Sequence, residues 1–257
     1  MTINWFEIQK AISPTKSYAD LCQRWQESLS YPFVRRVFNK TMPELVEYTR
    51  LGVGGDPRHR YDDYAAKLEV LFSSLEHAGV KDVIDLFNRF AEPERLDAFS
   101  EASGIPATDI AMVMKYLTYW FLPGPKYLGG LVRLDPGTSA AVKVLQEHGI
   151  RTNLDILQAG DTPAKRVLLA EKSGLPPYII DELVNRADFS RMPWASKATI
   201  SNIIGAGYGS LQQLAQAEPE QLYQDFFQYG KSIGKNLKLG NEIENSHRFA
   251  KIIPVIM

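Results

Sequence analysis

The chain has 257 residues, of which 45% are hydrophobic, 23% charged and 11% aromatic, a composition that is typical of globular proteins and excludes the disordered class. Its formal net charge of −1 argues against a strongly basic nucleic-acid coat and against a polybasic membrane binder. Because Cys22 is the single cysteine, an intrachain disulfide and a cysteine-based zinc site are both excluded.

Residues 1–63 show the apolar periodicity of helices and are expected to form an N-terminal helical region. Ser17 is placed to cap a helix in which Leu21, Trp25 and Leu29 repeat every four residues. Large apolar residues on one face of a helix are ordinary core packing, so this ladder predicts part of a core rather than a ligand site.

The clearest loop of the first half is LGVGGDPRHRYDDY, residues 51–64. Its glycines, with Arg58, His59 and Arg60 beside them, are one candidate for an anion-binding nest of backbone amides. The glycine spacing matches neither a P-loop nor a dinucleotide-binding fingerprint. Gly, Asp and Pro are generic turn formers, which favours a solvated connection between helices.

From residue 64 onward the chain is repetitive. A segment that begins at Gly79, GVKDVIDLFNRFAEPERLDAFSEASGIP, aligns without a gap with GIRTNLDILQAGDTPAKRVLLAEKSGLP, which begins at Gly149. The second glycines, Gly104 and Gly174, keep the same offset of 70 residues. The aligned segments share five polar or proline positions: Asp85/Asp155, Pro93/Pro163, Glu101/Glu171, Ser103/Ser173 and Pro106/Pro176. We interpret this register as an internal duplication.

In each copy the first glycine is expected to end a helix, a short helix follows, and a proline starts the next. A partial third copy begins at Gly207. The predicted organisation is therefore an N-terminal helical region (1–63), a first copy (64–121), a Gly/Pro-rich connection (122–138), and second and third copies with a C-terminal helix (139–257).

Residues 188–222 have the order helix, tight turn, helix, glycine stop and short helix, which is the layout of a helix-hairpin-helix unit. Three segments, GIRTNLDIL, RVLLAEKSGLPPYIIDELVNRADFSRMP and GAGYGSLQQLAQAEPEQL, resemble a bacterial family of uncharacterised proteins called domain of unknown function 4332. The resemblance covers about residues 134–222 and extends weakly back to 64. It implies an all-α fold of tandem helix-hairpin-helix-like units.

Related DNA-binding hairpins use Gly-apolar-Gly, which lets the backbone approach a phosphate. Here Trp194, Ala195 and Ser196 occupy those positions, although Ser196 is a good helix N-cap and Lys197 adds a cation. Six residues are candidates for contact with phosphates or nucleic acid: Arg191, Ser196, Lys197, Lys231, Lys235 and Lys238. The alternative is a solvated helical face with scattered lysines.

Trp194 admits three interpretations. Its indole is a candidate partner anchor, because tryptophan is favoured at the centres of interfaces. It is also a candidate stacking platform for nucleic-acid bases. The third interpretation is a ring that folds back as a plug over the helix pair.

No catalytic constellation is apparent in the sequence. The four histidines, His59, His77, His148 and His247, lie in separate regions and have no metal-ligand spacing. Asp85 and Asp155 recur between copies, and a polar residue that recurs in a duplicated turn is usually structural. We therefore expect a protein without enzymatic activity and without a cofactor.

The N-terminus lacks a basic region followed by an apolar run, so we expect no signal peptide. The apolar stretch AMVMKYLTYWFL is too short for a membrane span and contains Lys115. We expect a cytoplasmic all-α binding or scaffold protein with no membrane partner. Protein–protein interaction is the favoured role, and sequence-independent binding of the DNA backbone through the hairpin and the C-terminal lysines is the alternative. The oligomeric state does not follow from the sequence.

Overall fold

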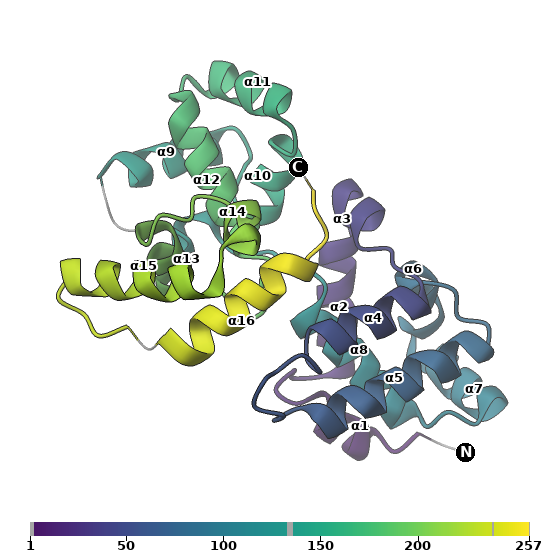
Figure 1. The fold of residues 1–257 in the computed structure, drawn as a ribbon. Coiled ribbons are helices and arrows are strands. Elements are labelled where there is room, and N and C mark those ends of the chain that lie inside the picture. Colours follow the sequence, from purple (N-terminus) through teal and green to yellow (C-terminus); the bar gives the residue numbers. More distant parts are fainter. Residues whose placement is uncertain (1–2, 133–135, 238, 257) are drawn as a thin grey trace. The chain divides into compact units, whose positions relative to one another are not determined.

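The structure is a computed structural model that describes residues 3–132, 136–237 and 239–256 (Figure 1). The fold is all-α: the described residues form sixteen α-helices and one short 3-10 helix, and their only β-type pairings are two isolated bridges. The chain divides into two compact units, Met1–Gly124 and Pro125–Met257. The boundary between the units falls inside the predicted connection, 122–138.

Unit 1 contains eight helices: α1 (Trp5–Ile12), α2 (Tyr18–Leu29), α3 (Pro32–Val37), α4 (Met42–Leu51), α5 (Asp62–His77), α6 (Val83–Phe90), α7 (Pro93–Ser103) and α8 (Ala107–Trp120). Helix α8 packs against α1, α2, α5 and α7. The buried indole of Trp25 donates to the Met114 carbonyl (3.2 Å) and to the Thr118 hydroxyl (2.6 Å). Residues 1–63 therefore share one core with residues 64–121.

The loop between α4 and α5 is organised by a buried carboxylate. Asp56 accepts from the Arg60 Nε atom (2.7 Å) and from the Arg58 backbone N–H (3.3 Å). The Asp56 carboxylate thus already occupies the Arg60 Nε atom and the Arg58 backbone N–H, where an external anion would have to bind. The geometry favours the structural connection over the anion nest.

Unit 2 contains one 3-10 helix and eight α-helices: η1 (Leu128–Gly130), α9 (Pro136–Glu147), α10 (Asn153–Ala159), α11 (Pro163–Ser173), α12 (Pro177–Phe189), α13 (Lys197–Gly205), α14 (Leu211–Gln216), α15 (Pro219–Ser232) and α16 (Leu239–Ile252). Helix α12 packs against α10, α11 and α14. Helix α9 begins inside the predicted connection, whose last residues it therefore includes.

The two units repeat the same order of helices, α5–α8 in unit 1 and α9–α12 in unit 2. Helices α7 and α11 differ by 70 residues at both ends, which is the offset of the sequence alignment. The glycines that end the helices also share their backbone conformation: φ is 71° at Gly104 and 66° at Gly174. A Cβ atom is strained in this left-handed region, so glycine is the residue that fits.

Helices α13–α16 form a further set in the same order. Gly207 (φ 104°) follows α13, Ser210 caps α14, and Gly234 (φ 65°) precedes α16. Helix α14 packs against α16 as α10 packs against α12. The order of helices in α13–α16 is thus the same as in α5–α8 and α9–α12, and α16 is the C-terminal helix that the sequence predicts.

Candidate functional site

The hairpin between α12 and α13 holds Trp194 in an unusual backbone conformation. Its φ angle is +58°, which lies in the left-handed region that residues with a Cβ rarely adopt. The chain thus keeps the backbone geometry of a glycine at this position while it carries the largest side chain. The hairpin backbone must be fixed by its surroundings for such a conformation to persist.

The Trp194 indole is partly packed and partly exposed. Its ring meets Phe249 of α16 edge to face, with centroids 6.5 Å apart and ring planes at 86°. Yet 55% of Trp194 remains accessible to solvent, whereas Phe249 is fully buried. The ring is therefore anchored along one edge and presents the rest of its surface outward, which is intermediate between a plug and a free platform.

Lys126 supports the hairpin from below. Its Nζ atom donates to the Ser190 carbonyl (2.6 Å) and to the Ala195 carbonyl (3.4 Å), and burial lowers its pKa. Asn153 continues the network, accepting from the Lys126 backbone N–H (2.6 Å) and donating to the Ser190 hydroxyl (2.9 Å). Sequence reasoning missed this role, because nothing local to Lys126 indicates that it lies under a hairpin more than 60 residues away.

Arg191, a predicted phosphate contact, is buried. Its Nε atom donates to Asp188 Oδ1 (2.8 Å) and its Nη1 atom donates to the Pro254 carbonyl (2.7 Å). Asp188 is itself buried, so the pair neutralises two charges inside the unit. Arg191 therefore has a structural role at the base of the hairpin, and its side chain is not exposed on the surface where a phosphate would bind.

Ser196 and Lys197 begin α13 beside Trp194. The Ser196 hydroxyl oxygen accepts from the Thr199 backbone N–H (3.1 Å) and so caps the helix, as its residue type predicts. Lys197 is partly exposed and has no ion-pair partner among the described residues. Trp194, Ser196 and Lys197 are thus the predicted site residues that the fold brings together.

Lys231 and Lys235 lie away from this group. A Cβ added at Gly205, the last residue of α13, would fall 2.2 Å from Tyr229 Cζ, so the end of α13 touches α15 just before Lys231. A helix of nine residues spans about 13 Å, and Ser196 stands at its other end. Both lysines are exposed, and the Lys231 amine lies 4.4 Å from the centre of the Phe227 ring. Lys238 lies outside the described residues.

The glycine turns that precede α6, α10 and α14 use their own amides internally. The Lys81 and Arg151 backbone N–H groups donate to Asp85 and Asp155, each at 2.9 Å, and Gly209 donates to the Gln213 side chain (2.8 Å). Asp85 and Asp155, the acid that recurs in the two copies, thus accept hydrogen bonds from the backbone of the turn that precedes their own helix. Since these donors are occupied, the three turns do not offer them to an external phosphate.

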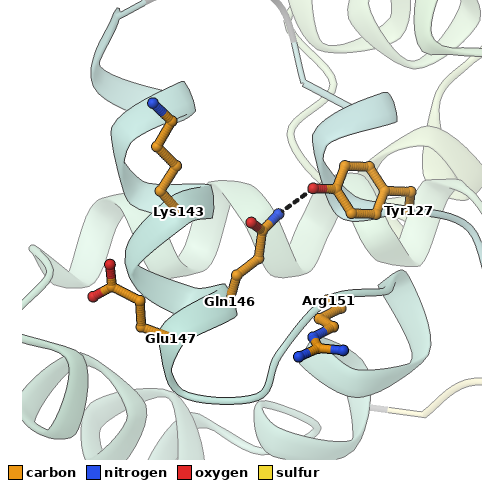
Figure 2. A pocket seen from close by; sticks show the side chains of 5 residues that line it. All are labelled: Tyr127, Lys143, Gln146, Glu147 and Arg151. Atoms are coloured by element: carbon orange, nitrogen blue, oxygen red, sulfur yellow. Dashed lines mark hydrogen bonds between the residues drawn. The ribbon is translucent and has the colours of Figure 1, made fainter.

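An open pocket of about 500 Å³ lies beside the turn between α9 and α10 (Figure 2). Its lining comes from three places: Lys143, Gln146 and Glu147 on α9, Arg151 on the turn, and Tyr127 just before η1. The Gln146 amide donates to the Tyr127 hydroxyl (2.5 Å). Within the described part of the chain, the charged side chains of this pocket form no ion pair.

The described residues contain neither a metal-binding cluster nor a membrane-spanning helix. No group of three or more His, Cys, Asp or Glu side chains is arranged to hold a metal ion in the ranges that the structure describes. Over the same ranges, no helix combines the length and the apolar character that crossing a bilayer requires.

Comparison with known families gives one match. Residues 136–242 match the family model described as "Domain of unknown function (DUF4332)". The match begins at the start of α9 and ends within α16, so it lies in unit 2. No curated protein and no solved structure matches the chain.

Proposed function

We propose that this chain, whose residues 136–242 belong to the DUF4332 family, is a non-enzymatic binding or scaffold protein that docks a protein partner through the α12–α13 hairpin. The observation that supports this function is the Trp194 indole, 55% exposed on a hairpin that holds it at φ +58°. A ring that served only as a plug would be buried like its neighbour Phe249.

The support beneath the hairpin makes Trp194 a rigid anchor. The Lys126 amine donates to the Ser190 and Ala195 carbonyls, which lie on either side of the indole in the chain, and Arg191 ties the hairpin to the Pro254 carbonyl. A side chain that is already held in place loses little conformational entropy on binding, and tryptophan is enriched among residues that dominate interface energy. Lys197 follows the ring in the chain and has no ion-pair partner in the part of the chain that the structure describes. The partner that fits has an apolar pocket for the indole with acidic groups at its rim.

DNA-backbone binding is the second candidate, supported by the hairpin layout and by Lys197 at the start of α13. The charges favour it less. Affinity for DNA grows with the number of phosphates that cations neutralise, and the structure withdraws Arg191 while placing Lys231 at the far end of α13. The hairpin itself then offers one cation, which is a small footprint.

The test compares partners recovered by crosslinking in the native host from the wild-type chain, Trp194→Gly and Tyr178→Ala. Tyr178 is a matched control because it is 69% exposed on α12 and lies outside the hairpin. We expect a partner that is lost with Trp194→Gly and Lys197→Glu but retained with Tyr178→Ala. An unchanged set of partners in Trp194→Gly would refute the proposal.

A parallel titration with labelled DNA separates the two candidates. Micromolar binding that collapses between about 50 and 200 mM salt, and also with Lys197→Ala, would replace the protein-docking function with DNA binding. Flat titrations with single-stranded and double-stranded DNA are the result that we expect.

A further inference from the structure

The pocket beside the α9–α10 turn combines groups that the hairpin does not use. Lys143 and Arg151 are exposed cations without ion-pair partners in the described structure, and Glu147 is an exposed carboxylate without one. Figure 2 shows Gln146 and Tyr127 pointing toward each other between Lys143 on one side and Arg151 on the other. Cations that are not neutralised by the protein are available to an anionic ligand.

Tyr127 is fixed as a hydrogen-bond donor toward the pocket. Its hydroxyl oxygen accepts from Gln146, and a hydroxyl that accepts one bond still has its own hydrogen to donate. The backbone holds Tyr127 beside the turn through a bridge to Thr152 and through the bond from the Leu128 N–H to the Arg151 carbonyl (2.9 Å). Tyr127 and Arg151 are therefore positioned together by the fold rather than by flexible side chains.

The first copy has the same turn but a different set of side chains. With the 70-residue offset, the positions of Lys143, Gln146, Glu147 and Arg151 correspond to Ser73, Glu76, His77 and Lys81. The turn geometry is shared, since Gly79 and Gly149 have φ angles of 85° and 80°. The aromatic, doubly cationic lining is thus particular to the second copy and is not required to build the turn.

We propose that this pocket binds a small phosphorylated ligand that also carries hydroxyl groups. The phosphate is held by the Arg151 guanidinium and the Tyr127 hydroxyl, and the flexible Lys143 amine adds charge from across the pocket. Glu147 accepts hydrogen bonds from the ligand's hydroxyls. A volume of about 500 Å³ suits a molecule of nucleotide size, because small-ligand sites occupy roughly 300 to 1,000 Å³.

The experiment is a titration of the full chain with adenosine monophosphate, in which backbone-amide NMR shifts report binding. We expect saturable shifts confined to residues of α9, the α9–α10 turn and the Tyr127 segment, complete by about 10 mM, where a weak site of this kind saturates. Arg151→Gln should weaken binding by about tenfold, because a charged hydrogen bond is lost. Glu147→Gln should weaken binding of the nucleotide but leave the weaker binding of inorganic phosphate unchanged.

Lys81→Gln is the matched control, since it makes the same charge change at the corresponding position of the first copy. Lys81→Gln should leave the affinity for the nucleotide unchanged. Gln146→Glu introduces the acid that the first copy has at the corresponding position, Glu76, and should weaken binding without altering the turn. The proposal fails if no shifts appear, if Lys81→Gln weakens binding as much as Arg151→Gln, or if an oligonucleotide binds here while the mononucleotide does not. Trp194→Gly should bind the nucleotide normally, so this result is independent of the hairpin.

Discussion

The Trp194 ring rests edge to face on Phe249, with the centroids 6.5 Å apart, and so joins the α12–α13 hairpin to α16. The contact links the start of one four-helix set to its last helix. Aromatic pairs of this geometry contribute about 0.5–1.5 kcal/mol beyond the area that they bury. The left-handed backbone conformation at Trp194 lowers the stability of the fold, whereas the ring contact raises it, so mutations can separate the two effects.

The Trp194→Gly variant should be more stable than the Trp194→Ala variant. Both substitutions remove the contact with Phe249, but only glycine relieves the left-handed conformation, which costs a residue with a Cβ about 1–2 kcal/mol. We expect Trp194→Gly to exceed Trp194→Ala by about 1 kcal/mol in the free energy of unfolding, measured with urea. The control is Ala140→Gly at an exposed position in the interior of α9, where the glycine variant should be less stable by about 0.5–1 kcal/mol. Equal stabilities at 194 would contradict a left-handed hairpin.

Local chemistry made much of the fold predictable. A proline entry and a Ser-Gly stop mark α7 and α11, and the structure starts and ends both helices at those signals. The segment that begins at Gly207 was predicted as a partial copy, and the spacing of its glycines differs: 27 residues separate Gly207 from Gly234, whereas 25 separate Gly149 from Gly174. An insertion of two residues breaks a gap-free alignment but leaves the order of helices intact.

The site was less predictable because its contacts are long-range. Ser196 was predicted as a cap from its own sequence neighbourhood, and it is one. The burial of Arg191 depends on the Pro254 carbonyl, 63 residues away, and the hairpin depends on Lys126, 64 residues before Ser190. The left-handed backbone conformation of Trp194 could not be predicted from its residue type, since a bulky residue rarely adopts it.

Removal of the turn acid Asp155 should destabilise unit 2. Its Oδ2 atom accepts from the Arg151 N–H (2.9 Å) and from the Thr152 N–H (2.8 Å). Asp155→Ala leaves both donors without this acceptor, for an expected loss of about 1–2 kcal/mol in the free energy of unfolding. Chemical denaturation followed by circular dichroism measures it. Glu171→Ala, an exposed acid on α11, should change stability by less than about 0.5 kcal/mol, and a comparable loss there would remove the case for a capping role.

Acidification should destabilise the packing of α16 through His247. This side chain is buried, and its Nε2 atom has no hydrogen-bond partner among the described residues. Burial, and after it the nearby Lys251 charge, lowers the pKa of His247. The backbone of Ala217 and Ala215 and the Glu218 charge oppose this shift. Because the folded pKa lies below the ordinary value of 6.5, the unfolded chain binds the proton more tightly, and stability falls as the pH drops below 6.5.

The measurement for His247 is the urea midpoint about one pH unit above and about one below 6.5. The wild-type midpoint should fall on the acid side, and His247→Gln should reduce this fall. His148→Gln is the control, because His148 is exposed on the α9–α10 turn. A wild-type pH dependence that survives in His247→Gln would show that another group is responsible.

Gly230→Ala should reverse the usual effect of this substitution in a helix. Alanine ordinarily stabilises a helix interior by about 0.5–1 kcal/mol relative to glycine. At Gly230, however, an added Cβ would lie 2.8 Å from the Lys235 carbonyl oxygen and 3.2 Å from Leu237 Cγ, because the chain folds back here after α15. The Lys235 N–H also donates to the Gly230 carbonyl (2.8 Å), so the backbone cannot retreat without loss of that bond.

The expected result is a loss of about 1–3 kcal/mol in the free energy of unfolding for Gly230→Ala, the range for an overpacked site. Gly130→Ala is the matched control, since its Cβ would meet nothing within 4 Å, and it should be neutral within about 0.5 kcal/mol. The turn after Gly230 leads into α16, which supports Trp194 through Phe249. Gly230→Ala should therefore also increase quenching of Trp194 fluorescence, in a variant that retains only this tryptophan. A stabilised Gly230→Ala protein would mean that the chain after α15 does not fold back on Gly230.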